Sequence, residues 1–204
     1  ILFVRIDRRR KFHATVLLRA LGMAAEELLN YFYRRDTIVL DGRKAAKLFH
    51  SEHLVGVKAT RVVRHPGSNE LIVKEGRKFT KLSLQRIEQA GIEQIPIALE
   101  EVIGRVTAHD IKDPKSGELL LAINEEVTDE KLEIFRTRGI NRLELLILDD
   151  SHIGPALRNT LIQDKIADPQ EAILEIYRRL RPGDPPTPET ATAFFNNLFF
   201  NPER

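Results

Sequence analysis

An internal repeat occupies the middle of the chain and constrains its fold more than any other feature. Residues 52–92 can be placed on residues 100–140 without a gap, and ten of the 41 positions are then identical. Both copies show the same order of patterns, which is strand, proline-containing turn (HPGSNE or DPKSGE), strand, helix, glycine and strand. The identical pairs are Glu52/Glu100, Gly56/Gly104, Pro66/Pro114, Ser68/Ser116, Glu70/Glu118, Leu71/Leu119, Thr80/Thr128, Leu84/Leu132, Gly91/Gly139 and Ile92/Ile140.

The repeat predicts the architecture of this region. Thr80 and Thr128 are good N-cap residues for the two helices, and Gly91 and Gly139 end them. One copy is a single supersecondary unit, so two copies are needed to build a stable module. We therefore predict an inserted α+β module with two ββαβ-like units, related by a pseudo-twofold axis, whose strands form a small barrel or sandwich.

The sequence on both sides of the repeat has longer helical patterns. Residues 1–36 combine a short strand, a basic turn and two apolar helical segments. Residues 142–204 contain a buried type of strand, RLELLILDD, and three helical segments. We predict two domains: a mixed helix and strand lobe made of residues 1–36 and 142–204, and a module at 37–141 that interrupts it. The strand RLELLILDD also suits the end of the second copy, which would place that boundary several residues later.

Composition excludes several classes of protein. The chain of 204 residues has no Cys, which excludes disulfides, thiol catalysis and cysteine metal sites. No run of 18 apolar residues is present, so we predict no membrane span. The first residues place charge after apolar residues, the reverse of a signal peptide, and they read as the middle of a strand. We expect a piece of a longer chain.

Positive charge is concentrated near the N-terminus. The net charge is only +2, but residues 1–36 hold eight Lys and Arg against four Asp and Glu, whereas residues 142–204 hold seven against ten. Five cations and one anion fall within residues 5–11, RIDRRRK. Such a cluster neutralises phosphates and releases counterions, although a solvated charge run at the boundary of an element has the same composition. A second basic spot contains Arg181, at the start of a loop that its prolines make stiff.

No set of residues in the sequence indicates catalysis. His50 and His53 could hold a metal only with a third ligand from a poorly defined turn, and no Gly-rich phosphate loop or Ser-His-Asp set is present. Asp149 and His152 could act as an acid–base pair, but a turn before a helix also needs Asp and Ser for capping. We therefore predict no catalytic residue and no metal site, with a hydrolase that uses Asp149 and His152 as an alternative.

Three stretches of the chain resemble one known family. FVRIDRRRKFHATVLLRALG, GPALRNTLIQDK and EIYRRLRPGDPPTPETATAFFNNLFFNPER are similar to stretches of the bacterial RNA polymerase β subunit, and KEGRKFT resembles a segment between them. The last stretch is the most specific, because a proline-rich loop before an aromatic-rich helix is not a general motif. The resemblance covers the whole chain and implies the β lobe with a lineage-specific insertion of the proteobacterial type. His13 stands where the family has proline.

The resemblance implies a role at DNA without a role in the chemical step. The lobe of this family forms one wall of the downstream DNA channel, so we expect a non-catalytic part of DNA-directed RNA polymerase, a nucleotidyltransferase, that is inactive when isolated. The catalytic Mg²⁺ belongs to the β′ subunit, and we expect no cofactor in this chain. The residues expected to bind DNA, at the downstream edge of the transcription bubble, are Asp7, Arg8, Arg9, Arg10, Lys11 and Arg204, together with Arg181 from the second basic spot.

The same resemblance implies the partners. We expect DNA, the β′ and α subunits, the remainder of β, a sigma factor and, at the insertion, regulators, with no membrane, in the cytoplasm at the nucleoid. The alternative is a protein-interaction scaffold whose basic run contacts another subunit and not DNA. The two hypotheses differ in salt dependence, since phosphate binding weakens steeply with salt and an apolar protein contact does not.

Overall fold

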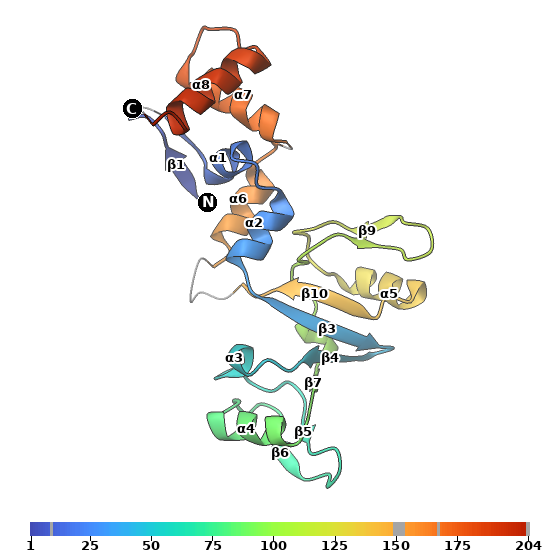
Figure 1. The fold of residues 1–204 in the computed structure, drawn as a ribbon. Helices are drawn as coiled ribbons and strands as arrows, with labels where there is room; N and C mark the ends of the chain where they lie inside the picture. The colour runs from blue at the N-terminus through green and yellow to red at the C-terminus, as the bar shows by residue number, and fades with distance from the viewer. Residues whose placement is uncertain (9, 149–153, 167, 203–204) are drawn as a thin grey trace. The chain divides into compact units, whose positions relative to one another are not determined.

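The chain divides into two compact units in the computed structural model, which describes residues 1–8, 10–148, 154–166 and 168–202 (Figure 1). Unit 1 contains Ile1–Tyr33 and Leu148–Arg204, and unit 2 contains Arg34–Ile147. Helices and small antiparallel sheets occur in both units, which confirms the predicted α+β class. None of the helices in the described ranges is long and apolar enough to cross a membrane.

A four-stranded antiparallel sheet forms the framework of unit 2. β3 (Arg35–Asp41) and β4 (Lys44–Leu48) form a hairpin that turns at Gly42, whose φ of 61° favours glycine. β7 (Gln94–Ile97) pairs with β4, and β10 (Arg142–Leu146) pairs with β3, which gives the order β10-β3-β4-β7. The outer strands of this sheet, β10 and β7, do not pair with each other, so the sheet is open. The structure thus has an open sheet and separate two-stranded sheets where we predicted a small barrel or sandwich.

The two copies of the repeat have matching structures. Thr80 and Thr128 each cap a helix by accepting a hydrogen bond from the backbone N–H three residues later, at 3.2 Å in both copies. Gly56 and Gly104 have nearly the same left-handed φ, 79° and 80°. Residue i and residue i+48 therefore lie in corresponding elements. These are α3 (Ser51–Leu54) and η1 (Leu99–Glu101), β5 (Val63–Arg64) and β8 (Ile111–Lys112), β6 (Leu71–Val73) and β9 (Leu119–Leu121), α4 (Lys81–Gln89) and α5 (Asp129–Arg138), and β7 and β10.

The hydrophobic cores of unit 2 use positions that correspond across the repeat. Ile87 in α4 and Phe135 in α5 are related by the 48-residue offset, and both are fully buried. Most of the paired core residues differ in type, so the copies keep the position and apolar character of each side chain and not its identity. The matched buried pairs are Leu54/Val102, Val63/Ile111, Val73/Leu121, Phe79/Val127, Leu84/Leu132, Ile87/Phe135, Ile95/Leu143 and Ile97/Leu145.

Unit 1 combines helices with a two-stranded hairpin. Asp168 caps α7 by accepting a hydrogen bond from the backbone N–H of Glu171 at 2.9 Å. Tyr33 donates its hydroxyl hydrogen to the carbonyl of Gly154 at 2.9 Å, and burial raises the pKa of Tyr33. The elements are β1 (Phe3–Arg5), β2 (Lys11–His13), α1 (Ala14–Ala20), α2 (Ala25–Phe32), α6 (Ala156–Gln163), α7 (Pro169–Leu180) and α8 (Pro188–Phe199). α1, α7 and α8 share a hydrophobic core that contains Val16, Ala20, Ala172, Ile173, Ile176, Tyr177, Ala191 and Phe195.

The bounds of the units differ from the predicted domain bounds. The prediction places the insertion at residues 37–141, whereas unit 2 begins at Arg34 and ends at Ile147. Strand pairing is the reason, since Asp36 lies opposite Leu145 in the ladder between β3 and β10. The first half of RLELLILDD thus closes the sheet of unit 2 and does not belong with the lobe. That each unit folds as an independent domain stays a prediction.

Excision of unit 2 is expected to leave unit 1 folded. The backbone N–H of Ile147 donates to the carbonyl of Arg34 at 2.8 Å, so the two ends of unit 2 are adjacent. A short Gly/Ser linker can therefore join Tyr33 to Leu148 without stretching the chain. An excision at the predicted bounds, 37–141, is the matched control. It leaves two residues of β3 and all of β10 without the rest of their sheet, so the product should fold less well.

Tyrosine fluorescence measures the outcome of this excision. The chain has three tyrosines and no Trp, and Tyr31, Tyr33 and Tyr177 all lie in unit 1. We expect a cooperative urea transition in the shortened chain, at a midpoint close to that of unit 1 in the intact chain. A molten or insoluble product, obtained while the intact chain folds, would show that unit 1 depends on unit 2.

Candidate nucleic-acid interface

The described residues of the basic run lie at the end of β1, in the loop that follows it and at the start of β2, in unit 1. β1 and β2 pair antiparallel, with Phe3 opposite His13 and Arg5 opposite Lys11. Because side chains alternate along a strand, these four side chains share one face of the hairpin. Phe12 points from the opposite face and is buried. The hairpin therefore packs on unit 1 by one face and presents the other to solvent.

Asp7 shapes the loop between the two strands. Its Oδ1 atom accepts a hydrogen bond from the backbone N–H of Arg10 at 2.8 Å, which closes a turn across the basic residues. This hydrogen bond is a sufficient reason for a carboxylate among the cations, and no contact between Asp7 and DNA is needed to explain it. Asp7 thus has a positioning role within the loop, and its own contact with DNA stays a prediction.

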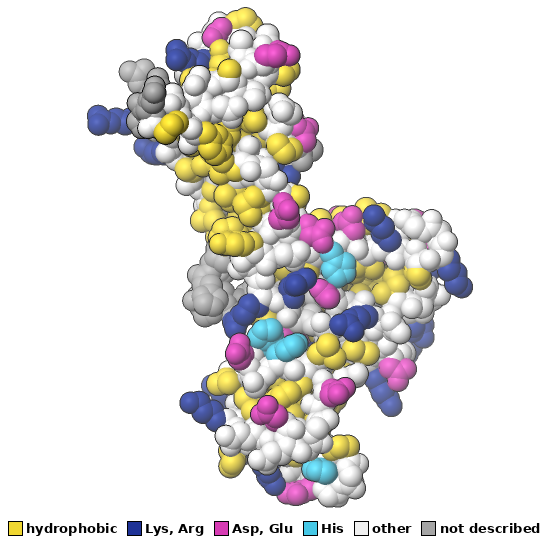
Figure 2. Space-filling model, viewed as in Figure 1, with side chains coloured by type: hydrophobic (Ala, Val, Ile, Leu, Met, Phe, Trp, Pro, Cys, Tyr) yellow, Lys and Arg dark blue, Asp and Glu magenta, His cyan; other side chains and the backbone are white. Residues whose placement is uncertain are grey.

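The described cations of the hairpin are all exposed. Figure 2 shows Lys and Arg side chains at the edge of unit 1 where Figure 1 places β1. No acidic side chain lies among them in the described part of the loop except that of Asp7. The exposed cations are Arg5, Arg8, Arg10 and Lys11. Of the other residues predicted to bind DNA, Arg9 and Arg204 lie outside the described residues.

Arg179 of α7 fixes the base of the hairpin to the helices. Its Nη1 atom donates to the carbonyl of Lys11 at 3.2 Å, and its Nε atom donates to Oε1 of Glu175 at 2.6 Å. Its guanidinium carbon also lies 5.7 Å from the ring centroid of Phe12. The sequence analysis missed this role, since a cation near the end of a helix gives no sign that it reaches a strand 168 residues earlier.

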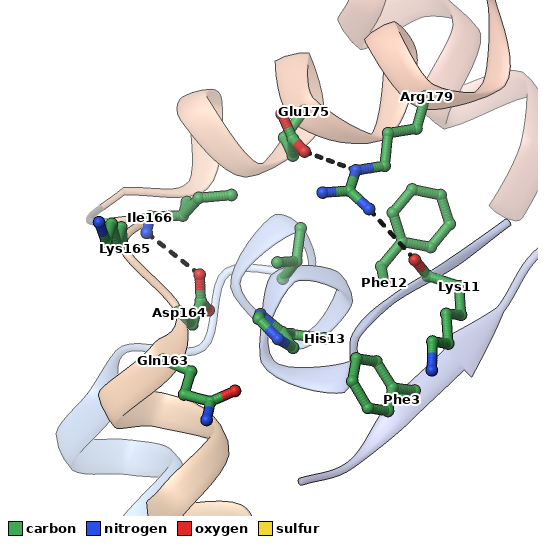
Figure 3. A pocket seen from close by; sticks show the side chains of 11 residues that line it. Phe3, Lys11, Phe12, His13, Gln163, Asp164, Lys165, Ile166, Glu175 and Arg179 are labelled. Carbon is green, nitrogen blue, oxygen red and sulfur yellow. Dashed lines mark hydrogen bonds and ion pairs between the residues drawn. The ribbon is translucent and has the colours of Figure 1, made fainter.

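A pocket of about 240 Å³ lies beside the hairpin, between β2, α1 and the segment that joins α6 to α7 (Figure 3). Asp164 is the buried carboxylate of its lining. The hydroxyl of Thr15 donates to Oδ2 of Asp164 at 2.6 Å, and the backbone N–H of Ile166 donates to Oδ1 at 3.1 Å. Nε of Arg19 lies 3.6 Å from the same Oδ2 atom. This cluster joins α1 to the end of α6.

Arg181 lies in the same unit, at the end of α7, and is exposed. Its guanidinium carbon is 5.4 Å from the ring centroid of Phe194 in α8. The hydroxyl of Tyr177 donates to Oδ2 of Asp184 at 2.5 Å and so holds the proline-rich loop against α7. This hydrogen bond, together with burial, raises the pKa of Tyr177. The loop is therefore fixed, as its prolines indicate, and DNA contact by Arg181 stays a prediction.

The histidines singled out in the sequence have other surroundings. Nδ1 of His53 lies 3.2 Å from Oδ1 of Asp36, whose Oδ2 atom pairs with Arg105 at 2.9 Å. Within the described ranges, no group of three or more His, Cys, Asp or Glu side chains is arranged to hold a metal ion. Asp149 and His152 lie outside the described residues. The hairpin, an exposed basic loop with a fixed backbone, has the chemistry expected of a module that binds polyanions.

Comparison with known proteins identifies the family. The chain is 51% identical over 219 residues to the DNA-directed RNA polymerase subunit beta of Anaeromyxobacter sp. (strain Fw109-5), 50% identical over 205 residues to that of Syntrophotalea carbinolica (strain DSM 2380 / NBRC 103641 / GraBd1), and 46% identical over 219 residues to that of Myxococcus xanthus (strain DK1622). Each match covers 100% of the chain, whereas the chain spans only 15–16% of the length of these relatives. No protein-family model matches it. The chain belongs, as a segment, to the family of bacterial RNA polymerase β subunits, which confirms the resemblance.

Proposed function

We propose that the chain is a non-catalytic segment of a DNA-directed RNA polymerase, a nucleotidyltransferase, and that unit 1 forms part of the wall of the downstream DNA channel. The exposed basic loop between β1 and β2 carries this proposal. Asp7 fixes the backbone of the loop, and Arg8 and Arg10 extend into solvent. Cations on a fixed loop bind phosphates with little loss of backbone freedom, and they release counterions from the DNA. These properties support contact with DNA at the downstream edge of the transcription bubble.

The remaining predicted contacts belong to the same proposal. Lys11 lies on the hairpin and Arg181 on the fixed loop after α7, and Arg9 and Arg204 complete the set of DNA-binding residues. The catalytic Mg²⁺ is held by the β′ subunit, so the isolated segment has no activity. The partners are DNA, the β′ and α subunits, the remainder of β and a sigma factor, in the cytoplasm at the nucleoid. Unit 2 offers a surface to regulators.

A protein-interaction scaffold is the second candidate function, and one observation favours it. Tyr31 and Phe32 at the end of α2 are 76% and 38% exposed, and their rings meet edge to face at 5.0 Å. Exposed aromatic side chains of this kind are typical of protein contacts. If the chain is only a scaffold, the basic loop also contacts protein, and no residue of the hairpin lies close to DNA.

Site-specific photocrosslinking in the assembled polymerase distinguishes the two functions. A photoreactive amino acid at position 8 is expected to crosslink to downstream DNA in a promoter complex, because Arg8 is exposed on the loop. The same amino acid at position 26, where Glu26 is exposed on α2, is the control and should give no DNA product. Crosslinks from position 8 that reach only protein would contradict DNA contact and favour the scaffold.

A further inference from the structure

The two copies of the repeat in unit 2 carry opposite charge at matching positions. In the first copy, residues 74–81 (KEGRKFTK), the basic segment, hold four cations and one anion, whereas the matching residues 122–129 (AINEEVTD) hold three anions and no cation. All of these charged side chains are exposed. The anion of the basic segment, Glu75, lies 3.9 Å from Arg61, outside the segment. The fold is shared between the copies, so charge distinguishes their surfaces.

Two lysines meet at the basic segment. Lys78 forms an antiparallel bridge with Lys58, so two cations lie directly opposite one another, an arrangement that destabilises a pair of strands. The matching bridge of the second copy joins Val106 to Glu126 and has no such repulsion. Among the described residues, neither lysine forms an ion pair with a carboxylate. An anionic partner at this place would relieve the repulsion.

A groove of about 610 Å³ lies between β6 and the start of α4, next to the basic segment. β6 contributes an apolar strand, Leu71–Val73, to its lining, and three cations, Lys74, Arg77 and Lys78, contribute charge. No acidic side chain belongs to this lining within the described ranges. The groove thus offers an apolar surface beside positive charge that the protein itself does not neutralise.

The second copy closes the equivalent space with a side chain of its own. Lys131 of α5 donates from its Nζ atom to the carbonyl of Leu120 in β9, across the gap between helix and strand. The matching residue of the first copy is Ser83, whose hydroxyl donates instead to the carbonyl of Thr80 at 2.9 Å. The first copy therefore has a short serine where the second has a lysine that spans the gap, and its groove stays open.

We propose that the groove of the first copy binds an acidic segment of a protein partner, in which carboxylates alternate with apolar side chains. The carboxylates pair with Lys74, Arg77 and Lys78, and an apolar side chain packs on half-buried Leu71 and Ile72. The anions of the second copy repel the same segment, so the repeat presents one binding surface and not two.

Nucleic acid fits this groove less well than an acidic protein segment does. The described lining residues include no aromatic side chain on which a base could stack, and phosphates alone would leave the apolar strand uncovered. The inference rests on the proposed function, in which unit 2 offers a surface to regulators. It adds the place on unit 2 and the chemistry of the partner.

Fluorescence anisotropy of a labelled peptide with the assembled polymerase tests the proposal. The probe is a short fluorescein-labelled peptide in which glutamate alternates with leucine. Replacement of Lys74, Arg77 and Lys78 by glutamate should weaken its binding by roughly 10-fold, and replacement by glutamine should weaken it less. The matched control reverses three exposed cations elsewhere in unit 2, Lys112, Lys115 and Arg142. Equal losses from the two charge-reversed variants would contradict binding in the groove.

Ser83→Lys separates occupation of the groove from general attraction by charge. It adds a cation but places in the first copy the lysine that closes the equivalent space in the second, so peptide binding should weaken by roughly 5-fold. Thr128 caps α5 beside Lys131, so Thr80 should still cap α4 beside the new lysine. Unchanged or tighter binding by Ser83→Lys would overturn the proposal.

Two further probes identify the class of partner. A peptide in which serine replaces leucine should bind more weakly, and equal binding would show that the apolar strand takes no part. A short duplex DNA that displaces the peptide from the parent, but does not bind the charge-reversed variant, would assign the groove to nucleic acid and overturn the proposal. None of these measurements involves the β1–β2 hairpin, so crosslinking from position 8 remains a separate test of the proposed DNA contact.

Discussion

Replacing Arg8, Arg9 and Arg10 by alanine is expected to flatten the salt dependence of DNA binding by the assembled polymerase. Each phosphate contact that is lost lowers the magnitude of the slope of log K against log salt by about 0.9 on duplex and about 0.7 on single strands. Three contacts on duplex correspond to a change of about 2.7. When salt is raised from about 50 to about 200 mM, the affinity of both enzymes falls. The factor by which it falls should be roughly 40 times smaller for the variant than for the parent.

The matched control removes the same charge elsewhere. Arg43, Arg61 and Arg64 are exposed in unit 2, so their replacement by alanine lowers the net charge equally without changing the β1–β2 hairpin of unit 1. Promoter-complex lifetime and affinity are measured against salt for both triple variants. If the hairpin variant keeps the slope and lifetime of the parent, these arginines do not face DNA, and the scaffold becomes the better explanation.

Asp7→Ala should behave differently from the arginine variants. The substitution removes the acceptor of the Arg10 backbone hydrogen bond and takes no cation from the loop. The loop loses its fixed shape, so we expect a shorter complex lifetime with nearly the parent salt slope. A slope that changes as much as in the triple variant would mean that the loop cannot place its cations without Asp7.

Asp164→Ala is expected to destabilise unit 1 by about 3 kcal/mol. The carboxylate of Asp164 accepts hydrogen bonds from Thr15 and Ile166 and pairs with Arg19, whose side chain is only 12% exposed. Its removal takes the carboxylate partner from a largely buried guanidinium and leaves the Thr15 hydroxyl without its acceptor. Urea unfolding followed by tyrosine fluorescence measures the loss in unit 1 alone.

Asp168→Ala is the control for this substitution. It removes the same charge four residues away but only the N-cap of α7, a loss of about 1 kcal/mol. Equal losses from the two variants would mean that the Asp164 cluster contributes no more than an ordinary cap. A larger loss from Asp164→Ala would show that the Asp164 cluster contributes more to the stability of unit 1 than an ordinary cap does.

Local signals in the sequence predicted most of unit 2. Threonine N-caps, glycines and proline-containing turns recur at a fixed offset, and each acts on the backbone within a few residues of itself. The elements of the two copies therefore correspond at the predicted offset, and the pseudo-twofold axis stays a prediction. The placement of β10 depends instead on pairing with β3, more than 100 residues earlier, and the pattern of RLELLILDD suits either domain. Only the pairing decides between them.

Only part of the candidate interface could be predicted, again because local signals can be read from a sequence and long-range contacts cannot. The cations of the basic run are close together in the sequence, so the exposure of the described ones on one hairpin follows from the composition and the turn. Asp164 bonds to a threonine 149 residues away, and Arg179 to a carbonyl 168 residues away. Side chains that act across such separations have no periodicity or spacing that a single sequence reveals.

The pairing of β10 with β3 also sets the order in which unit 2 can form during synthesis. β3 ends at residue 41, and β10 begins at residue 142. At about 5–20 residues per second, the ribosome needs roughly 5 to 20 s to make the chain between them. During that interval β3, β4 and β7 can already form a three-stranded sheet, in which the β3 edge still lacks its partner. We expect this nascent sheet to be the stage at which the polypeptide most needs protection by chaperones, and its exposure ends when β10 leaves the ribosome and occupies that edge.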